Sequence, residues 1–148
     1  GLRRPTPDFA VSTDIIVGFP SETDDDFQRT VALVEEVRFS FIFAFKYSSR
    51  PRTPAARFPA QVPEEVKSKR LNYLLALQKK ITTEQNNAEI GNERQVLVYY
   101  QSKKEPHIYY GRTDHFRLVR IFSRTNIVGK MLTVKITAGN ATALVGCL

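Results

Sequence analysis

The chain has 148 residues, of which 42% are hydrophobic, and it carries a net charge of +7. This length suits one ordinary domain or two small ones, and the apolar content excludes a disordered chain. There is no run of about 18 uncharged apolar residues, which excludes a transmembrane helix. The amino terminus has neither an initiator methionine nor the apolar segment of a signal peptide, so we expect a piece of a longer protein.

The first predicted elements form a strand–helix–strand unit. Residues 12–19 are apolar and β-branched and include a glycine near their end, which predicts a buried parallel strand. Residues 24–38 have apolar side chains at helical spacing, and they follow Thr23, a favourable N-cap. Residues 39–47 are aromatic and apolar, which predicts a second buried strand. The three elements together predict a βαβ unit with a right-handed crossover.

A proline-rich loop and a long helix come next. Residues 48–63 contain four prolines, too many for a regular element. Pro63 opens a helix that we expect to reach about Asn87. We assign the apolar stripe of this helix to packing and not to chemistry; it consists of Val66, Leu71, Leu74, Leu75, Leu77 and Ile81.

The pattern changes at Gly91, where short β-rich stretches begin. These stretches are residues 95–100, 109–112, 117–122, 131–138 and 143–147. Five short strands in this space predict a small closed antiparallel barrel. We therefore expect two domains, 1–90 and 91–148, and a fold that is α/β in the first and all-β in the second.

The positive charge is concentrated in the second predicted domain. Residues 91–148 contain nine lysines and arginines but three acidic residues, a net charge of +6. Such a field favours a polyanionic partner such as RNA. The alternative is a basic surface that serves only solubility.

Cysteine and histidine usage gives no metal site. Cys147 is the only cysteine, so the chain can form neither an internal disulfide nor a multi-cysteine centre. His107 and His115 lack the spacing of a metal-binding pair, and we expect both in surface loops. A reducing compartment fits this composition.

Two loops are candidates for ligand binding. Residues 18–23 follow the first predicted strand and residues 47–54 follow the second, so both are expected at the carboxyl edge of a parallel sheet, where ligands bind in α/β folds. Gly18 permits close approach of the backbone, and Arg50 and Arg52 offer guanidiniums for a phosphate or carboxylate. The alternative is a plain strand-to-helix turn and an exposed proline-rich connection.

Basic residues alternate with aromatic residues in the predicted barrel. This combination suits unpaired RNA bases, although some of the aromatic rings must fill the barrel core. The residues are Tyr99, Tyr100, Lys103, Lys104, Tyr109, Tyr110, Arg112, Phe116, Arg117 and Arg120.

The stretch Ser12-Thr13-Asp14-Ile15-Ile16-Val17-Gly18-Phe19-Pro20-Ser21-Glu22-Thr23 closely resembles the strand-and-loop signature of the radical-SAM methylthiotransferases, whose loop usually reads Gly-Phe-Pro-Gly-Glu-Thr. The resemblance continues through residues 26–27, 34–39, 47–55 and 61–67. Ser102-Lys103-Lys104 and Gly111-Arg112-Thr113-Asp114 resemble the TRAM domain of that family. The branch that acts on isopentenyladenosine in tRNA is more similar than the branch that acts on ribosomal protein S12.

The resemblance implies a fold and an activity. The fold would be the C-terminal βαβ portion of a radical-SAM (β/α) partial barrel, a long linking helix, and a small antiparallel TRAM β-barrel that binds RNA. The whole enzyme would use S-adenosylmethionine and two [4Fe-4S] clusters to add a methylthio group to isopentenyladenosine next to the anticodon. Its partners would be the tRNA anticodon arm and the missing N-terminal part of the same enzyme, in the cytoplasm.

The resemblance also assigns residues. The residues expected beside S-adenosylmethionine or substrate are Ile16, Gly18, Pro20, Glu22, Ser48, Arg50 and Thr53. The residues expected to bind RNA are Lys103, Lys104, Arg112, Arg117, Arg120 and Lys130. No catalytic residue and no metal ligand are expected in this chain.

The chain departs from the family pattern in two respects. Ser21 and Arg52 replace usual glycines, which costs about 1 kcal/mol or more wherever the backbone needs a positive φ. The cysteines that hold the clusters are absent, and Cys147 cannot replace them, so we expect this chain alone to bind no cluster and to be inactive. Two alternatives remain at this point: a stand-alone RNA-binding module without catalysis, or an enzyme of the S12 type.

Overall fold

The computed structural model describes residues 9–148 and divides the chain into two compact units, one reaching to Ile81 and one starting at Thr82. The elements in chain order are β1 (Ser12–Val17), α1 (Asp24–Val37), β2 (Phe41–Lys46), a short 3₁₀ helix (Pro54–Arg57), α2 (Glu64–Ala88), β3 (Glu93–Gln101), β4 (Ile108–Thr113), β5 (Leu118–Phe122), β6 (Met131–Gly139) and β7 (Leu144–Cys147).

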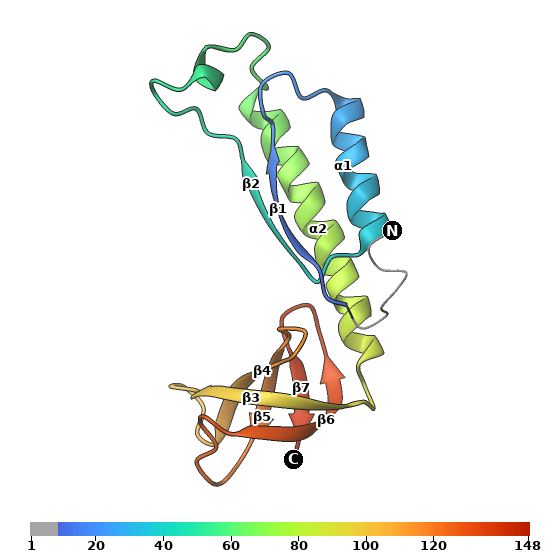
Figure 1. The fold of residues 1–148 in the computed structure, drawn as a ribbon, viewed down its shortest axis with the longest axis vertical. Coiled ribbons are helices and arrows are strands. Elements are labelled where there is room, and N and C mark those ends of the chain that lie inside the picture. The colour runs from blue at the N-terminus through green and yellow to red at the C-terminus, as the bar shows by residue number, and fades with distance from the viewer. Residues whose placement is uncertain (1–8) are drawn as a thin grey trace. The chain divides into compact units, whose positions relative to one another are not determined.

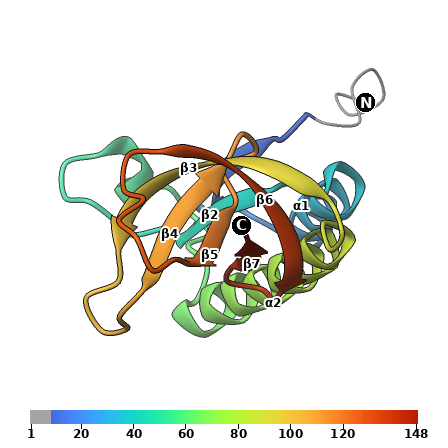
Figure 2. The same ribbon diagram turned by 90° about the horizontal axis from the view of Figure 1, so that it is seen from below.

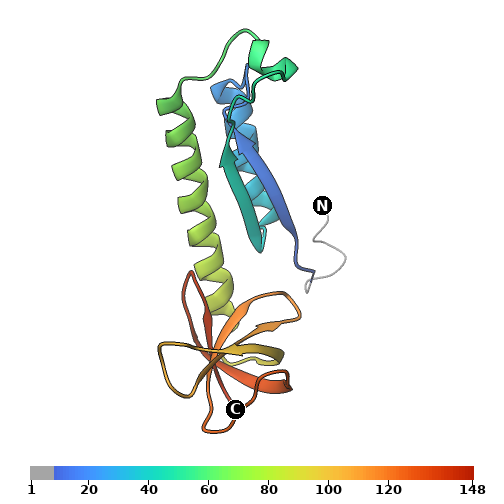
Figure 3. The same cartoon turned by 90° about the vertical axis from the view of Figure 1, so that its left-hand side faces the viewer.

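The first unit is built on two parallel strands. β1 and β2 pair in parallel from Ser12 opposite Phe41 to Val17 opposite Lys46, and α1 connects them. The predicted parallel pairing of these two strands through a helix is thus confirmed. Figures 1 and 3 show α1 and the first part of α2 on the same side of the strand pair. The other side of the pair faces solvent in this chain, where Ile16 is 58% exposed.

The core of the first unit lies between the strands and the two helices. β1 and both helices contribute side chains that are fully buried, such as Val17 from β1, Val34 from α1 and Leu74 from α2, and β2 adds the partly buried Ile42. The prediction that Leu75 belongs to the packing stripe of α2 is wrong, because this side chain is 47% exposed. Leu75 follows Leu74 by one residue, and a helix turns about 100° per residue, so the two side chains point in different directions.

Helix α1 begins where its capping residues predict. The Thr23 side-chain oxygen accepts a hydrogen bond from Asp26 N at 3.1 Å, and the Asp26 carboxylate accepts one from Thr23 N at 3.0 Å. This reciprocal capping box satisfies backbone donors that would otherwise lack partners at the helix start. The helix ends at Arg38, which has a left-handed backbone with φ of 52°.

The second unit is a closed five-stranded barrel with the strand order β3-β4-β5-β7-β6 (Figure 2). The prediction of a barrel that is antiparallel throughout is wrong in one place, since β5 and β7 pair in parallel. The reason is geometric: strand directions cannot alternate all the way around a closed ring with an odd number of strands. The other four pairs are antiparallel.

The barrel interior is narrow and filled by aliphatic side chains. Val96, Val119 and Val134 are fully buried there. At Gly146 in β7, an added Cβ would lie 2.2 Å from Cγ1 of Val134, so no larger residue fits without displacing a core side chain. The interior is therefore a packed core, and ligand binding by this unit has to occur on its outer surface.

Among the residues that the structure describes, no helix is both long and apolar enough to cross a membrane.

Candidate functional site: a pocket at the strand ends and a basic barrel surface

A pocket of ≈ 600 Å³ lies at the carboxyl ends of β1 and β2 in the first unit. Its lining residues come from both strands and from the two loops that follow them: Ile16, Phe19, Phe45, Lys46, Tyr47, Ser48, Arg50, Thr53 and Ala55. Most of these residues are aromatic or aliphatic, Ser48 and Thr53 add hydroxyl groups, and Lys46 and Arg50 add positive charge. Such a site suits a ligand with a flat apolar part and a charged or hydrogen-bonding part.

The aromatic side chains of the pocket contact one another. The rings of Phe19 and Tyr47 meet edge to face with centroids 5.2 Å apart, and Phe58 contacts Phe19 at 6.2 Å. The Tyr47 hydroxyl oxygen is buried and has no hydrogen-bond partner among the described residues. A buried polar atom without a partner is costly in a folded protein, and in this pocket wall it marks a hydrogen-bonding group that the protein itself does not satisfy.

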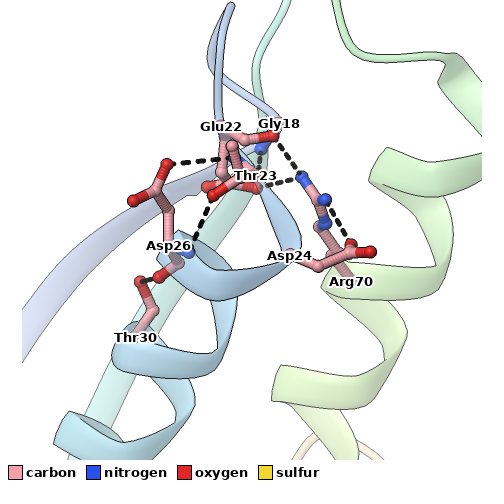
Figure 4. Close-up of polar contacts among 7 residues, drawn as sticks. All are labelled: Gly18, Glu22, Thr23, Asp24, Asp26, Thr30 and Arg70. Atoms are coloured by element: carbon pink, nitrogen blue, oxygen red, sulfur yellow. Dashed lines mark hydrogen bonds and ion pairs between the residues drawn. The ribbon is translucent and has the colours of Figure 1, made fainter.

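An ion-pair network fixes the loop after β1 (Figure 4). Arg70 from α2 donates to the Glu22 carboxylate at 2.7 Å and to Asp24 at 2.8 Å, and the Glu22 carboxylate also accepts a hydrogen bond from Gly18 N at 3.0 Å. Burial disfavours the charged guanidinium, but the hydrogen bonds to Asp24 and Glu22 outweigh it and raise the pKa of Arg70 above its ordinary value. Arg70 therefore stays a cation that holds the loop in one conformation.

Lys67 contacts both loops from α2, the one after β1 at Gly18 and the one after β2 at Tyr47. Its ammonium donates to the carbonyl oxygen of Tyr47 at 3.1 Å, and its aliphatic stem lies against Gly18. A Cβ at Gly18 would come within 2.1 Å of Lys67 Cγ, and Gly18 has a positive φ of 75°. Only glycine fits both demands at this position.

The two positions where the family's usual glycine is replaced both have left-handed backbones. Ser21 has φ of 74° and Arg52 has φ of 69°. The loops thus keep the conformation that glycine favours, and Ser21 N still donates to the carbonyl oxygen of Ala60 at 2.9 Å. Both residues therefore carry the cost of about 1 kcal/mol or more that a non-glycine residue has at a positive φ.

The structure brings together four of the seven residues that were expected near S-adenosylmethionine or substrate. Ile16, Ser48, Arg50 and Thr53 line the pocket. Gly18, Pro20 and Glu22 do not line it; they lie in the loop behind it, where Glu22 is bound by Arg70 and Gly18 is covered by Lys67.

Sequence reasoning missed several pocket residues, above all Phe19 and Phe45. Phe45 lies directly opposite Ile16 in the pairing of β1 and β2, and residues opposite each other share a face. The predicted parallel pairing of these strands, together with their register, would have placed Phe45 beside Ile16.

The six residues that were predicted to bind RNA differ in their surroundings on the barrel. Lys103, Lys104 and Lys130 are exposed. Arg117 instead donates to Asn86 at 2.9 Å and Gln85 at 3.0 Å, side chains in the last turns of α2 that belong to the same unit. Arg117 is therefore a structural residue of this unit, a role that its sequence context did not indicate.

Arg112 and Arg120 lie on the outer face of the barrel, in β4 and β5. Arg120 donates to the Glu105 carboxylate at 3.0 Å, and this hydrogen bond is the main reason that the pKa of Arg120 is raised above its ordinary value. Arg112 lies over the ring of Phe116, with its guanidinium carbon 4.8 Å from the ring centroid. Both side chains are half-buried on the outer surface of the barrel.

The aromatic residues of the barrel also divide between core and surface. Tyr109 is 4% exposed and belongs to the core, whereas Tyr99 and Tyr100 are 47% and 51% exposed. A register shift between Val98 and Tyr100 lets two consecutive tyrosines face outward, where strict alternation would bury one of them.

No group of three or more histidine, cysteine or acidic residues that could hold a metal ion occurs in the described part of the chain. Cys147 is exposed and carries a free thiol.

Fold and site together define the class of the chain: an α/β unit with a ligand-sized pocket at its strand ends, joined in sequence to a small closed barrel with a basic surface. No family model matches it. It is 43% identical over 145 residues, 98% of its length, to the tRNA-2-methylthio-N(6)-dimethylallyladenosine synthase of Syntrophobacter fumaroxidans. It is 44% identical over 99% of its length to the enzyme of the same name from Carboxydothermus hydrogenoformans, and 41% identical over 98% to that of Geotalea uraniireducens.

The chain belongs to the family of these tRNA methylthiotransferases. It spans about a third of the length of the curated relatives that it matches, with 32% of the Syntrophobacter protein and 33% of the Carboxydothermus protein covered.

Proposed function

We propose that the chain is the C-terminal part of a tRNA methylthiotransferase that adds a methylthio group to isopentenyladenosine next to the anticodon. In this proposal the first unit supplies part of the wall of the S-adenosylmethionine and substrate site, and the barrel is a TRAM-type domain that binds the anticodon arm. The observation that carries the proposal is the 43% identity over 98% of the chain with enzymes named for this product. The name of these enzymes specifies tRNA and not a ribosomal protein.

The pocket fits the adenosine part of S-adenosylmethionine. Ile16, Phe19 and Phe45 offer apolar surface to a flat ring, and Tyr47 offers a buried hydroxyl that lacks a protein partner. Arg50, which lines the pocket, carries a positive charge that attracts the methionyl carboxylate. When bound, S-adenosylmethionine supplies the radical and methyl chemistry of the reaction.

The residues present do not fit an iron–sulfur cluster, which needs several thiolates. Cys147 is the only cysteine. Clusters therefore have to be held by parts of the enzyme outside this chain, and the role of this chain is to bind and orient S-adenosylmethionine and tRNA.

The first unit also has the surface expected of a fragment of a larger parallel barrel. Phe43 and Phe45 on β2 are 56% and 57% exposed and lie on the same side of the strand pair as Ile16. In a complete barrel this side faces the interior, ligands bind at the C-terminal ends of the strands, and each outer edge of the pair accepts a further strand.

The barrel carries the charge that tRNA binding requires. Residues 91–148 have a net charge of +6, and Lys103, Lys104 and Lys130 are exposed on this unit. Neutralised phosphates release counterions, so binding through such a surface weakens steeply with salt.

The test is equilibrium binding of tRNA to the whole chain over a series of salt concentrations. The combined variant Lys103→Ala, Lys104→Ala, Lys130→Ala should bind more weakly, and the slope of log K against log salt should fall by about 2–3, since each phosphate contact contributes about 0.7–0.9. Arg117 stays unchanged because it is needed for the fold.

A matched control removes Lys69, Lys79 and Lys80 from α2, which changes the net charge by the same amount. Equal losses in both triple variants would show that net charge and not the barrel surface governs binding. Unchanged affinity and slope in the barrel variant would refute this surface as the tRNA site.

A further inference from the structure

Phe116, in the turn between β4 and β5, combines an exposed ring with an unfavourable backbone. It is 58% exposed, and its φ is 62°, in the left-handed region that bulky L-residues rarely adopt. A ring in this position gains little from burial. Glycine or asparagine would suit the turn better, so stability does not explain a phenylalanine here.

The turn holds this ring in a fixed place. Phe116 N donates to the carbonyl oxygen of Thr113 at 2.9 Å, and the Thr113 hydroxyl accepts from Arg117 N at 3.2 Å. Arg112 donates from its guanidinium to the carbonyl oxygen of Phe116 at 3.0 Å while lying over the ring, 4.8 Å from its centroid. Ring and guanidinium are therefore assembled before any ligand arrives.

A second stacked pair lies next to the first on the same strand. Tyr110 precedes Arg112 by two residues in β4, so both side chains point to the outer face, about 7 Å apart along the strand. The ring of Tyr110 stacks on that of Tyr100 from β3 with centroids 5.4 Å apart and planes at 28°. The outer face of β3 and β4 thus carries the tyrosine pair next to Arg112, and Arg112 leads to the Phe116 ring in the turn that follows β4.

Positive charge accompanies these surfaces. Lys103 and Lys104 are exposed in the connection between β3 and β4. Flat aromatic and guanidinium faces stack with nucleobases of any identity, and these lysines, at the opposite end of β4 from Phe116, would bind phosphates on the far side of the tyrosine pair. An acidic peptide would use the charges but would leave the exposed rings without a role.

We propose that Phe116, held by Arg112, is a stacking platform for one unpaired base of the RNA substrate, and that the Tyr100–Tyr110 pair stacks with a neighbouring base. This rests on the proposed binding of tRNA by the barrel and adds the single-stranded part of the RNA as the element recognised.

The test compares two RNA probes of equal length on the whole chain, an eight-nucleotide oligoadenylate and an abasic oligomer, together with a tRNA anticodon stem–loop. Phe116→Gly removes the ring and relieves the left-handed backbone, so the melting temperature should not fall. Affinity for oligoadenylate should drop about 5- to 100-fold, with the salt slope unchanged because no charge is lost. Affinity for the abasic oligomer should not change.

Three further variants separate stacking from structure. Phe116→Tyr keeps a ring and should bind like the wild type, whereas Phe116→Leu keeps the bulk and the backbone but lacks a ring and should bind as weakly as the glycine variant. Phe122→Thr removes another exposed aromatic ring of the barrel, which is 56% exposed, and should leave affinity unchanged.

Wild-type affinity in Phe116→Gly or Phe116→Leu would overturn the platform while leaving salt-dependent tRNA binding intact. Equal losses for oligoadenylate and the abasic oligomer would also overturn it. If the wild-type chain bound neither the stem–loop nor oligoadenylate, both the platform and the proposed tRNA binding would be refuted.

Discussion

Replacing Ser21 by glycine should stabilise the first unit by about 0.5–1 kcal/mol. Ser21 has φ of 74°, and a non-glycine residue in the left-handed region costs about 1–2 kcal/mol. Glycine avoids this cost, but it makes the unfolded chain more flexible, which offsets roughly 0.5–1 kcal/mol of the gain in stability. The hydrogen bond from Ser21 N to the Ala60 carbonyl uses only the backbone and survives the change.

The measurement is urea unfolding of the whole chain followed by circular dichroism, with Ser21→Ala as the matched control. Alanine also removes the hydroxyl but keeps the unfavourable φ, so it should give no gain. The same pair of substitutions at Arg52, whose φ is 69°, should behave alike. Equal stability of the glycine and alanine variants, or a loss on Ser21→Gly, would refute the argument that these loops keep a glycine conformation without glycine.

Three other substitutions test the contacts around the site. Arg70→Ala should lower the free energy of unfolding by about 3 kcal/mol, because it leaves the carboxylate of Glu22 partly buried without its cation; a loss below 1 kcal/mol in urea unfolding would contradict this. Arg117→Ala should destabilise the second unit by about 1–3 kcal/mol, because hydrogen bonds to Asn86 and Gln85 are lost, and an unchanged melting temperature would show that Arg117 is not structural. The hydrogen bonds of Thr23, first that from its backbone N–H, lower the pKa of Asp26 below its ordinary value of 3.8. The ionised Asp26 carboxylate therefore stabilises the fold above pH 3.8, and this stabilisation is lost as the pH falls through the lowered pKa. Asp26→Asn should remove this part of the acid dependence, so a plot of melting temperature against pH should become flatter.

The elements of the first unit could be predicted because their signals are local. Thr23 and the aspartates that follow it mark the start of α1, and the apolar runs on either side give the two strands. The capping contacts join residues three positions apart, so the sequence itself contains both partners.

Contacts between distant residues could not be predicted in the same way. Arg70 is separated from Glu22 by 48 positions, and Arg117 from Asn86 by 31, and nothing in the charge pattern identifies those partners. Glu22 was therefore expected to face a ligand, and Arg117 to face RNA, although each forms a contact within its own unit. The parallel pairing of β5 with β7 has the same origin, since it depends on how the ring closes and not on either strand alone.

The left-handed backbone at Phe116 and the register shift at Tyr100 also could not be predicted from local sequence patterns. Alternation along a strand predicts that one of two consecutive tyrosines is buried, but the shift exposes both Tyr99 and Tyr100. A positive φ is expected at glycine or asparagine and not at phenylalanine. The aromatic surface of the barrel is therefore a finding of the structure, even though its residues stood out in the sequence.

The central claim is that the chain is part of an enzyme that adds a methylthio group to tRNA. The most direct test is mass spectrometry of tRNA nucleosides from the source cells, with and without the gene that encodes this chain. Deletion of the gene should remove the 2-methylthio group while the isopentenyl group is retained. Nucleosides that are unchanged after deletion would contradict this claim.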